Sequence, residues 1–177
     1  MEADYLKYIE SVGEAELSEL MNRYGDDVWR YAYAITRDRE QASDIAQEVF
    51  IKAYYSLHTF KGRSTFKTWL LTITRNQAIN VRRSSYFRKV LLLESVRRRE
   101  VAPSAEADYM GRQSTDDIWT IIMQLPRKLR EVLVLDLQQD MTMKEIAELL
   151  ELSEGTVKSR LYRARKEVER QWKEREE

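Results

Sequence analysis

The chain has 177 residues, enough for one ordinary domain or two small ones, and 43% of them are hydrophobic. Its 34% charged residues, with only 5 Gly and 2 Pro, indicate a helical protein with much solvated surface. The absence of cysteine excludes disulfides, Cys-based zinc sites and thiol catalysis. No apolar run approaches the roughly 20 residues that span a bilayer, and the first ten residues lack the layout of a signal peptide. A cytoplasmic protein without direct membrane insertion is therefore expected.

Charge is distributed unevenly along this formally neutral chain. Residues 61–100 carry 11 Lys/Arg against 2 Asp/Glu, and residues 157–177 carry 8 against 5. In contrast, residues 1–60 carry 6 against 12, and residues 101–156 carry 5 against 11. Because the local potential determines where a polyanion binds, the two basic blocks predict two separate anion-binding surfaces.

The first half of the chain has the pattern of four helices around one core. Amphipathic periodicity predicts helices over residues 14–24, 26–35, 45–57 and 64–83. The inner face of the second consists of Val28, Trp29, Ala32 and Ile35. The third has a broad apolar stripe made of Ile45, Ala46, Val49, Phe50, Ala53, Tyr54 and Leu57.

A change of composition separates this half from a second helical unit. The first part of residues 84–114 can extend the preceding helix, whereas the second part holds Pro103, Gly111 and small polar residues without periodicity. We therefore predict an all-α fold of two small helical domains, residues 1–85 and 115–177, joined by a linker over residues 86–114.

Residues 60–83, FKGRSTFKTWLLTITRNQAINVRR, combine basic and aromatic side chains. In a helix that begins at Ser64, one face carries Trp69 and Ile73, which fit a core, and then Asn76, Asn80 and Arg83, which fit ligand contact. An aromatic ring next to a basic loop suits base stacking and phosphate contact on an unpaired strand. The simpler interpretation is an amphipathic helix with a solvated basic face. The predicted strand-binding set is Lys61, Arg63, Ser64, Phe66, Lys67, Arg75, Asn76, Asn80 and Arg83.

The segment TMKEIAELLELSEGTVKSRLYRARKEV predicts a helix-turn-helix. Thr142 and Glu145 have capping-box spacing, and Ser153 is placed to cap the second helix. Glu151 occupies the turn, where glycine is common, so a positive φ there should cost about 1 kcal/mol. The second helix can enter a major groove, although an ordinary helical hairpin with a basic face has the same pattern. The predicted DNA-binding set is Thr156, Lys158, Ser159, Tyr162, Arg163 and Lys166.

These motifs together resemble bacterial RNA polymerase sigma factors of the extracytoplasmic-function (ECF) group. The resemblance is carried, in the family's order, by DIAQEVFIKAY, the segment 60–83, IIMQLPRKLREVLVL and MKEIAELLELSEGTVKSRLYRARKEV. It implies a promoter-recognising subunit of RNA polymerase with no catalysis or cofactor of its own. Core RNA polymerase and promoter DNA are the implied partners, and an anti-sigma factor is the implied antagonist.

The resemblance also implies roles for individual residues. Asp44, Gln47 and Glu48, with Ile51 nearby, match the helix that docks on the polymerase clamp. The segment 60–83 matches the part that captures and melts the −10 element, and the second helix of the helix-turn-helix matches the −35 reader. Leu125–Pro126 and the helix that follows resemble the part that grips the polymerase flap tip. Asn80 stands where the family often has Asp, and the first half of the linker is basic where an acidic one is common.

Two other classes of protein compete with this interpretation. A conventional helix-turn-helix regulator with a sensory or interaction domain would share the C-terminal pattern, but it would not need the basic aromatic segment 60–83. An enzyme acting on nucleic acid would require a metal or acid–base constellation. His58, the only histidine, fits a loop contact better than catalysis, and no set of metal ligands or catalytic residues is evident.

Overall fold

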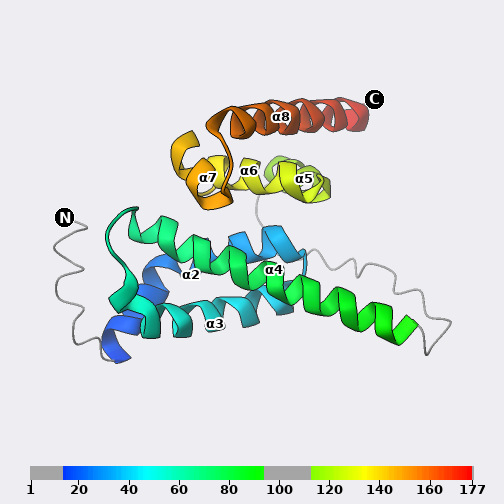
Figure 1. The fold of residues 1–177 in the computed structure, drawn as a ribbon. Helices are drawn as coiled ribbons and strands as arrows, with labels where there is room; N and C mark the ends of the chain where they lie inside the picture. The colour runs from blue at the N-terminus through cyan, green and yellow to red at the C-terminus, as the bar shows by residue number, and fades with distance from the viewer. Residues whose placement is uncertain (1–13, 94–112, 177) are drawn as a thin grey trace.

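The structure is a computed structural model that describes residues 14–93 and 113–176 (Figure 1). The described residues form seven α-helices and one 3₁₀ turn, with no β-strand among them. The predicted all-α fold is therefore confirmed. None of the helices in these two ranges is both long and apolar enough to cross a membrane. The elements are α2 (Glu14–Thr36), α3 (Arg39–Ser56), η2 (Leu57–Thr59), α4 (Phe66–Leu93), α5 (Gln113–Gln124), α6 (Arg127–Leu137), α7 (Met143–Leu150) and α8 (Glu154–Glu176).

The first domain consists of α2, α3 and α4, which pack pairwise against one another. The two helices predicted over residues 14–24 and 26–35 are one continuous helix, α2. A glycine inside a helix costs about 1 kcal/mol, but the buried positions Leu20, Tyr24, Val28 and Tyr31 continue one stripe across Gly25. Tertiary burial of that stripe outweighs the glycine, so three helices form this core where four were predicted.

Side-chain caps define where α3 and α4 begin. The Asp38 carboxylate accepts a hydrogen bond from the Gln41 amide at 3.0 Å and caps α3. At α4 the Thr65 hydroxyl accepts from the Thr68 amide at 3.1 Å, so the helix begins at Phe66, two residues later than the predicted start at Ser64. The expected continuation beyond residue 83 is present, because α4 runs to Leu93, eight residues into the segment assigned to the linker. The remainder, residues 94–112, lies outside the described residues.

The second domain consists of α5 to α8. The capping box at α7 is present, with the Thr142 hydroxyl accepting from the Glu145 amide and the Glu145 carboxylate accepting from the Thr142 amide. Glu151 ends α7 with a φ of 56°, the left-handed conformation anticipated for this turn. Ser153 then caps α8 by accepting from the Thr156 amide at 3.2 Å. The predicted helix-turn-helix is thus α7, this turn and α8.

The two domains pack directly against each other. Figure 1 shows α5 to α8 above α2 to α4, and α2 packs against α6 while α4 packs against α7. Buried residues from both domains belong to one continuous apolar cluster. The strand-binding helix predicted in the first domain therefore lies against the helix-turn-helix domain.

Candidate protein and nucleic-acid interfaces

The outer face of α3 carries acidic and apolar side chains together. Successive residues of a helix are about 100° apart, so Asp44, Gln47, Glu48 and Ile51 share one face. All four are exposed, and Ile51 has 53% of its surface accessible. The opposite face of α3 is buried through Ile45, Val49, Phe50 and Ala53. Since α3 is anchored by its apolar stripe, this outer face points away from the core and is accessible to solvent.

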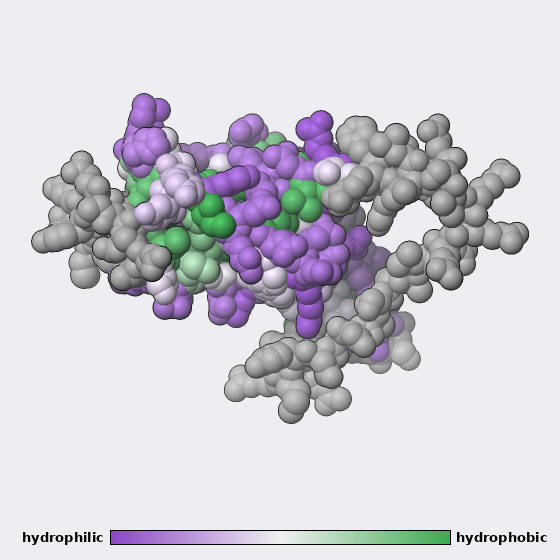
Figure 2. All heavy atoms as spheres, turned by 90° about the horizontal axis from the view of Figure 1, so that it is seen from below, coloured by the Kyte–Doolittle hydropathy of each residue, from purple (hydrophilic) through white to green (hydrophobic). Residues whose placement is uncertain are grey.

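Tyr55 belongs to the same face and was missed in the sequence analysis. It is 73% exposed and lies one helical turn beyond Ile51. A signal was available, because the spacing of four from Ile51 aligns the two side chains on a helix. Its neighbour Tyr54 belongs to the inner stripe and is half-buried. Seen from below, from the side of the first domain, the surface shows separate hydrophobic patches among hydrophilic residues (Figure 2).

A polar bridge joins the docking face of α3 to α4. The Gln77 side chain on α4 donates its amide hydrogen to the Glu48 carboxylate and accepts a hydrogen bond from the Lys52 ammonium through its carbonyl oxygen. The two α3 partners are four residues apart and therefore adjacent on one helix face. Gln77 thus restricts the orientation of Glu48, although nothing in its immediate sequence distinguished it.

The predicted strand-binding residues divide into an exposed group and a group held in the fold. Exposed are Lys61 and Arg63 in the loop before α4, and Asn76, Asn80 and Arg83 along the helix. Gly62 in this loop has a φ of 64°, which glycine adopts without the steric cost of a side chain. Trp69 and Ile73, expected in the core, are half-buried against it. The face therefore changes from packed to solvated along α4, as predicted.

Phe66 does not lie where its predicted role in strand binding requires. Only 3% of its surface is accessible, because its ring packs against Tyr24, Phe60 and Trp69 with centroid separations of 5.4 to 5.7 Å. This burial overturns the prediction that Phe66 offers its ring to an unpaired base. Aromatic clusters of this kind stabilise a core, and the ring instead supports the loop that carries the exposed cations.

Two of the predicted cations already have acidic partners. The Lys67 ammonium lies 3.0 Å from the Asp27 carboxylate of α2. The Arg75 Nε lies 3.7 Å from an oxygen of Glu131 on α6, in the other domain. Both cations are half-buried. Ser64, also half-buried, hydrogen-bonds through its hydroxyl to the backbone carbonyl of the next residue.

The predicted DNA-binding face of α8 points away from the domain core. Val157, Leu161 and Ala164 are buried, and they fix the rotation of the helix. On the other side, Lys158, Ser159, Tyr162, Arg163 and Lys166 are exposed, and Thr156 is half-buried beside its cap. The Lys166 ammonium lies 5.0 Å from the centre of the Tyr162 ring, a cation–π contact. The structure thus presents five of the six predicted residues on one solvated face.

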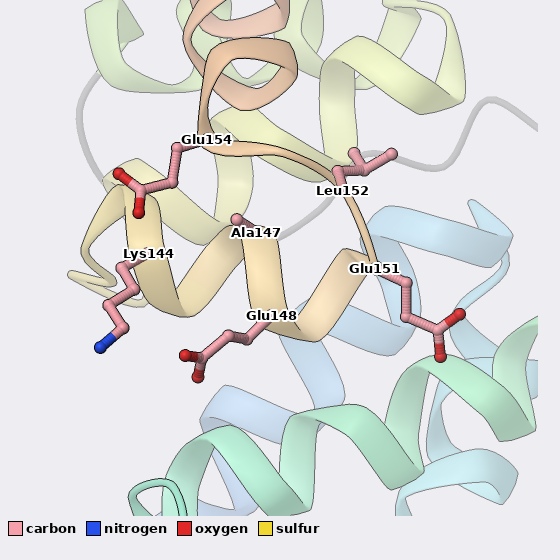
Figure 3. Close-up of a pocket in the computed structure, with 6 residues that line it drawn as sticks. All are labelled: Lys144, Ala147, Glu148, Glu151, Leu152 and Glu154. Carbon is pink, nitrogen blue, oxygen red and sulfur yellow. The ribbon is translucent and has the colours of Figure 1, made fainter.

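An open cavity of about 470 Å³ lies beside the turn of the helix-turn-helix. Figure 3 shows the residues that line it: Lys144, Ala147, Glu148, Glu151, Leu152 and Glu154. Three of its side chains are acidic, so the cavity repels the DNA phosphates that the basic face of α8 would attract. Within the described part of the chain, no group of three or more His, Cys, Asp or Glu could hold a metal ion.

Charged side chains are also buried where the two domains meet. Arg130 of α6 is 2% exposed and donates from Nε to the Ala34 carbonyl of α2 at 2.5 Å. Its Nη1 donates to the carbonyls of Met123 and Leu125 at the end of α5, at 3.0 and 2.7 Å. The guanidinium therefore neutralises the carbonyl ends of one helix from each domain. The only sequence signal for these contacts is the charged pair Arg130–Glu131, which stands directly before the apolar run VLVL.

Comparison with known proteins identifies two family regions. Residues 20–88 match sigma-70 region 2, and residues 115–168 match sigma-70 region 4. The ECF sigma factor SigX of Bacillus subtilis is 31% identical over 83% of this chain and 78% of its own length. The ECF sigma-E factor of Haemophilus influenzae is 31% identical over 85% of this chain and 84% of its own length.

Solved structures agree in fold. The sigma factor RpoE of Bartonella quintana, in complex with the anti-sigma factor NepR, has a TM-score of 0.72 at 24% identity, covering 89% of this chain and 97% of its own. CnrH, in complex with the cytosolic domain of CnrY, has a TM-score of 0.69 at 22% identity, covering 97% of each chain. With both regions in the family's order and relatives above 30% identity along most of the chain, the protein belongs to the ECF sigma factors, which direct RNA polymerase to promoters in transcription initiation.

Proposed function

We propose that this chain binds core RNA polymerase through the outer face of α3, opens the −10 element with α4 and reads the −35 element with α8. The observation that carries the proposal is the α3 face, where Asp44, Gln47 and Glu48 lie next to the exposed side chains of Ile51 and Tyr55. An apolar patch rimmed by polar residues is typical of a protein interface. The proposed action is binding rather than catalysis.

For the −10 element, exposed cations and amides along one edge of the first domain support strand capture. Lys61, Arg63 and Arg83 supply charge for phosphates, and Asn76 and Asn80 supply donors and acceptors for the edge of an unpaired base. Since Phe66 is buried, this surface acts through hydrogen bonds and charge. Arg75 belongs to the same set, but it can contact DNA only when its ion pair with Glu131 is broken.

For the −35 element, α8 is a helix of the kind that fits into a major groove, and its exposed side chains can contact bases and phosphates there. Arg163 can form a bidentate contact with guanine, Lys158 and Lys166 can meet phosphates, and Ser159 and Tyr162 can hydrogen-bond to either. All five side chains are exposed on the helix face opposite the buried stripe. A conventional helix-turn-helix regulator, the second class considered, accounts for α8 but does not need the exposed cations and amides of segment 60–83.

We further propose an anti-sigma factor as the inhibitory partner. The support is that two chains with a similar fold, RpoE and CnrH, were solved with NepR and with the cytosolic domain of CnrY, respectively. For this chain the exposed apolar residues Ile51 and Tyr55 are suitable contacts, because covering them would also block polymerase.

A charge-reversal experiment tests the docking proposal. Asp44→Lys combined with Glu48→Lys should weaken core polymerase binding by at least tenfold, since opposite charges would become like charges at the contact. The matched control is Glu19→Lys with Asp26→Lys, which changes two exposed acids on α2 by the same total charge. Equal core affinity of the test and control variants, at unchanged helix content, would remove the α3 face from the interface.

A further inference from the structure

Three arginine side chains converge where the last turns of α2 and α5 meet. Arg130 and Arg82 donate to successive carbonyls at the end of α2, and the Nη1 of Arg82 lies 3.2 Å from the Ile35 oxygen. Arg37, directly after α2, donates from Nη1 at 3.5 Å to the Met123 carbonyl, the same oxygen that accepts from Arg130 at 3.0 Å. The three guanidiniums are therefore neighbours, and together they form the arginine cluster.

Within the described part of the chain, no carboxylate forms an ion pair with this cluster. The ion pairs of these ranges use other cations. Glu131 pairs instead with Arg75 and Arg127, at 3.7 and 3.8 Å. Burial, followed by repulsion from Arg37 and Arg82, lowers the pKa of the Arg130 guanidinium to about 10, against the attraction of Glu131. The fold thus holds like charges together here.

Capping of the two helix ends accounts for only part of this charge. The carbonyl end of a helix is equivalent to about −0.5 charge, so the ends of α2 and α5 together supply about −1. Each guanidinium carries a full positive charge. A surplus of about two positive charges therefore remains on the cluster after both helix ends are counted. An anion with two negative charges would match it.

The cluster has a buried floor and an accessible rim. Arg130 is 2% exposed and is fixed by backbone carbonyls, whereas Arg37 and Arg82 are exposed. The Nη2 of each guanidinium donates to no other described residue, so donors remain for a ligand. Arg37 also has a φ of 58°, a conformation in which glycine is usual after a helix. A cation thus stands where the backbone favours glycine.

We propose that the arginine cluster is a binding site for a small dianion that carries a phosphate group. A guanidinium donates two parallel hydrogen bonds to phosphate oxygens, and several guanidiniums can surround one tetrahedral anion. Chloride has one charge and no pair of oxygens, so the cluster should select phosphate over chloride. This inference goes beyond the proposed function and does not depend on binding to polymerase or to a promoter.

A phosphate titration of the full chain alone tests the proposal. Inorganic phosphate is added while sodium chloride keeps the ionic strength constant, and nuclear magnetic resonance follows the Nε–H signals of the arginines. The signals of Arg37, Arg82 and Arg130 should shift and saturate together, whereas that of Arg30 on the exposed face of α2 should not. Phosphate also stabilises proteins by exclusion from their surface, so saturation is the decisive feature. Unsaturated drift of all arginine signals, or no shift in the cluster, would overturn the inference.

Paired variants show whether the rim of the cluster binds the anion. Arg37→Gln with Arg82→Gln leaves the buried Arg130 intact and should lower phosphate affinity at least tenfold. The matched control, Arg30→Gln with Lys173→Gln, removes the same charge from exposed positions that already have acidic partners, and its affinity should equal that of the wild type. Equal losses in both variants would assign the effect to net charge and refute the site.

The single variants Arg37→Gln and Arg82→Gln replace the double variant if that one does not fold. Each should lower phosphate affinity, and Arg82→Lys, which keeps the charge but not the planar fork, should lose less than Arg82→Gln. Unchanged affinity in both single glutamine variants would contradict the proposal.

The backbone of DNA is the other source of phosphate groups for this cluster. A promoter duplex should not displace inorganic phosphate from the wild type, and the Arg37→Gln, Arg82→Gln chain should lose no more duplex affinity than the control variant. Displacement together with a larger loss would make the cluster a DNA contact and overturn the inference. Because these titrations contain no polymerase, a failure of the docking proposal leaves their outcome unchanged.

Discussion

Gln77 of α4 donates its side-chain amide hydrogen to the carboxylate of Glu48 on α3. This contact links the proposed polymerase-docking face to the helix that carries Asn76 and Asn80. Its carbonyl oxygen accepts from Lys52 at the same time, so the amide of Gln77 can adopt only one of its two orientations. Gln77 is thus a positioning residue for Glu48.

Gln77→Ala should weaken core polymerase binding about two- to fivefold, because an exposed hydrogen bond of this kind contributes roughly 0.5–1 kcal/mol. A double-mutant cycle with Glu48→Ala shows whether Gln77 acts by orienting Glu48 or by stabilising the fold in general. In the Glu48→Ala background the effect of Gln77→Ala should vanish. An undiminished effect in that background would show that Gln77 acts elsewhere.

Arg163→Ala should report how α8 contacts the −35 element. If Arg163 forms a bidentate contact with a base, affinity should fall by about 1–3 kcal/mol and preference should relax at one position. A phosphate contact would instead lower affinity uniformly and reduce the salt slope by about one. Competition binding with single-base promoter variants at two salt concentrations distinguishes these outcomes. Retention of both affinity and preference would remove Arg163 from the DNA-reading face.

Much of this arrangement could be predicted from local sequence. The capping box of Thr142 and Glu145 and the buried stripe of α8 depend on spacings within one helix, and both are present. The burial of Phe66 depends instead on rings from α2 and from the loop before α4, which only tertiary packing brings together. The Arg130 contact with Ala34 joins residues 96 positions apart, so no local pattern could indicate it.

Asn80→Ala should impair promoter opening more than initial duplex binding. Its amide is exposed on α4 and can satisfy the edge of an unpaired base, which a duplex conceals. Permanganate reactivity of promoter thymines, measured beside gel-shift affinity, separates the two steps. The matched control is Asn22→Ala, an exposed asparagine on α2. A pre-melted bubble template should restore transcription by Asn80→Ala, and normal melting by this variant would return α4 to a purely structural role.

Glu151→Gly should stabilise the helix-turn-helix domain by about 1 kcal/mol. Glu151 has a φ of 56°, in the region where a side chain is sterically costly and glycine is not. Its amide hydrogen bonds to the carbonyls of Ala147 and Glu148 should be unaffected. Urea unfolding followed by circular dichroism measures the change. Glu151→Ala keeps the β-carbon, so an equal gain from alanine would attribute the effect to charge in the acidic cavity rather than to the backbone.

The last prediction concerns the pH dependence of the buried charges where the two domains meet. Burial raises the pKa of the Glu131 carboxyl above its usual 4.5, and the opposing attraction of Arg127, Arg75, Arg130 and Arg160 only partly offsets this effect. Burial also raises the pKa of the neighbouring Tyr31 well above 10, so that hydroxyl stays neutral. A carboxyl with a raised pKa binds its proton more tightly in the folded chain than in the unfolded one.

The free energy of unfolding contributed by Glu131 should therefore fall as pH rises from about 4.5 through the raised pKa, and recover as pH is lowered. Other carboxylates titrate in this range, so the measured quantity is the difference between wild type and Glu131→Gln in urea unfolding, from about pH 4.5 to about pH 8. Because the glutamine side chain cannot ionise, the variant should gain stability relative to wild type towards neutral pH. A pH-independent difference would mean that Glu131 keeps an ordinary pKa in the folded chain and that its burial there carries no desolvation cost.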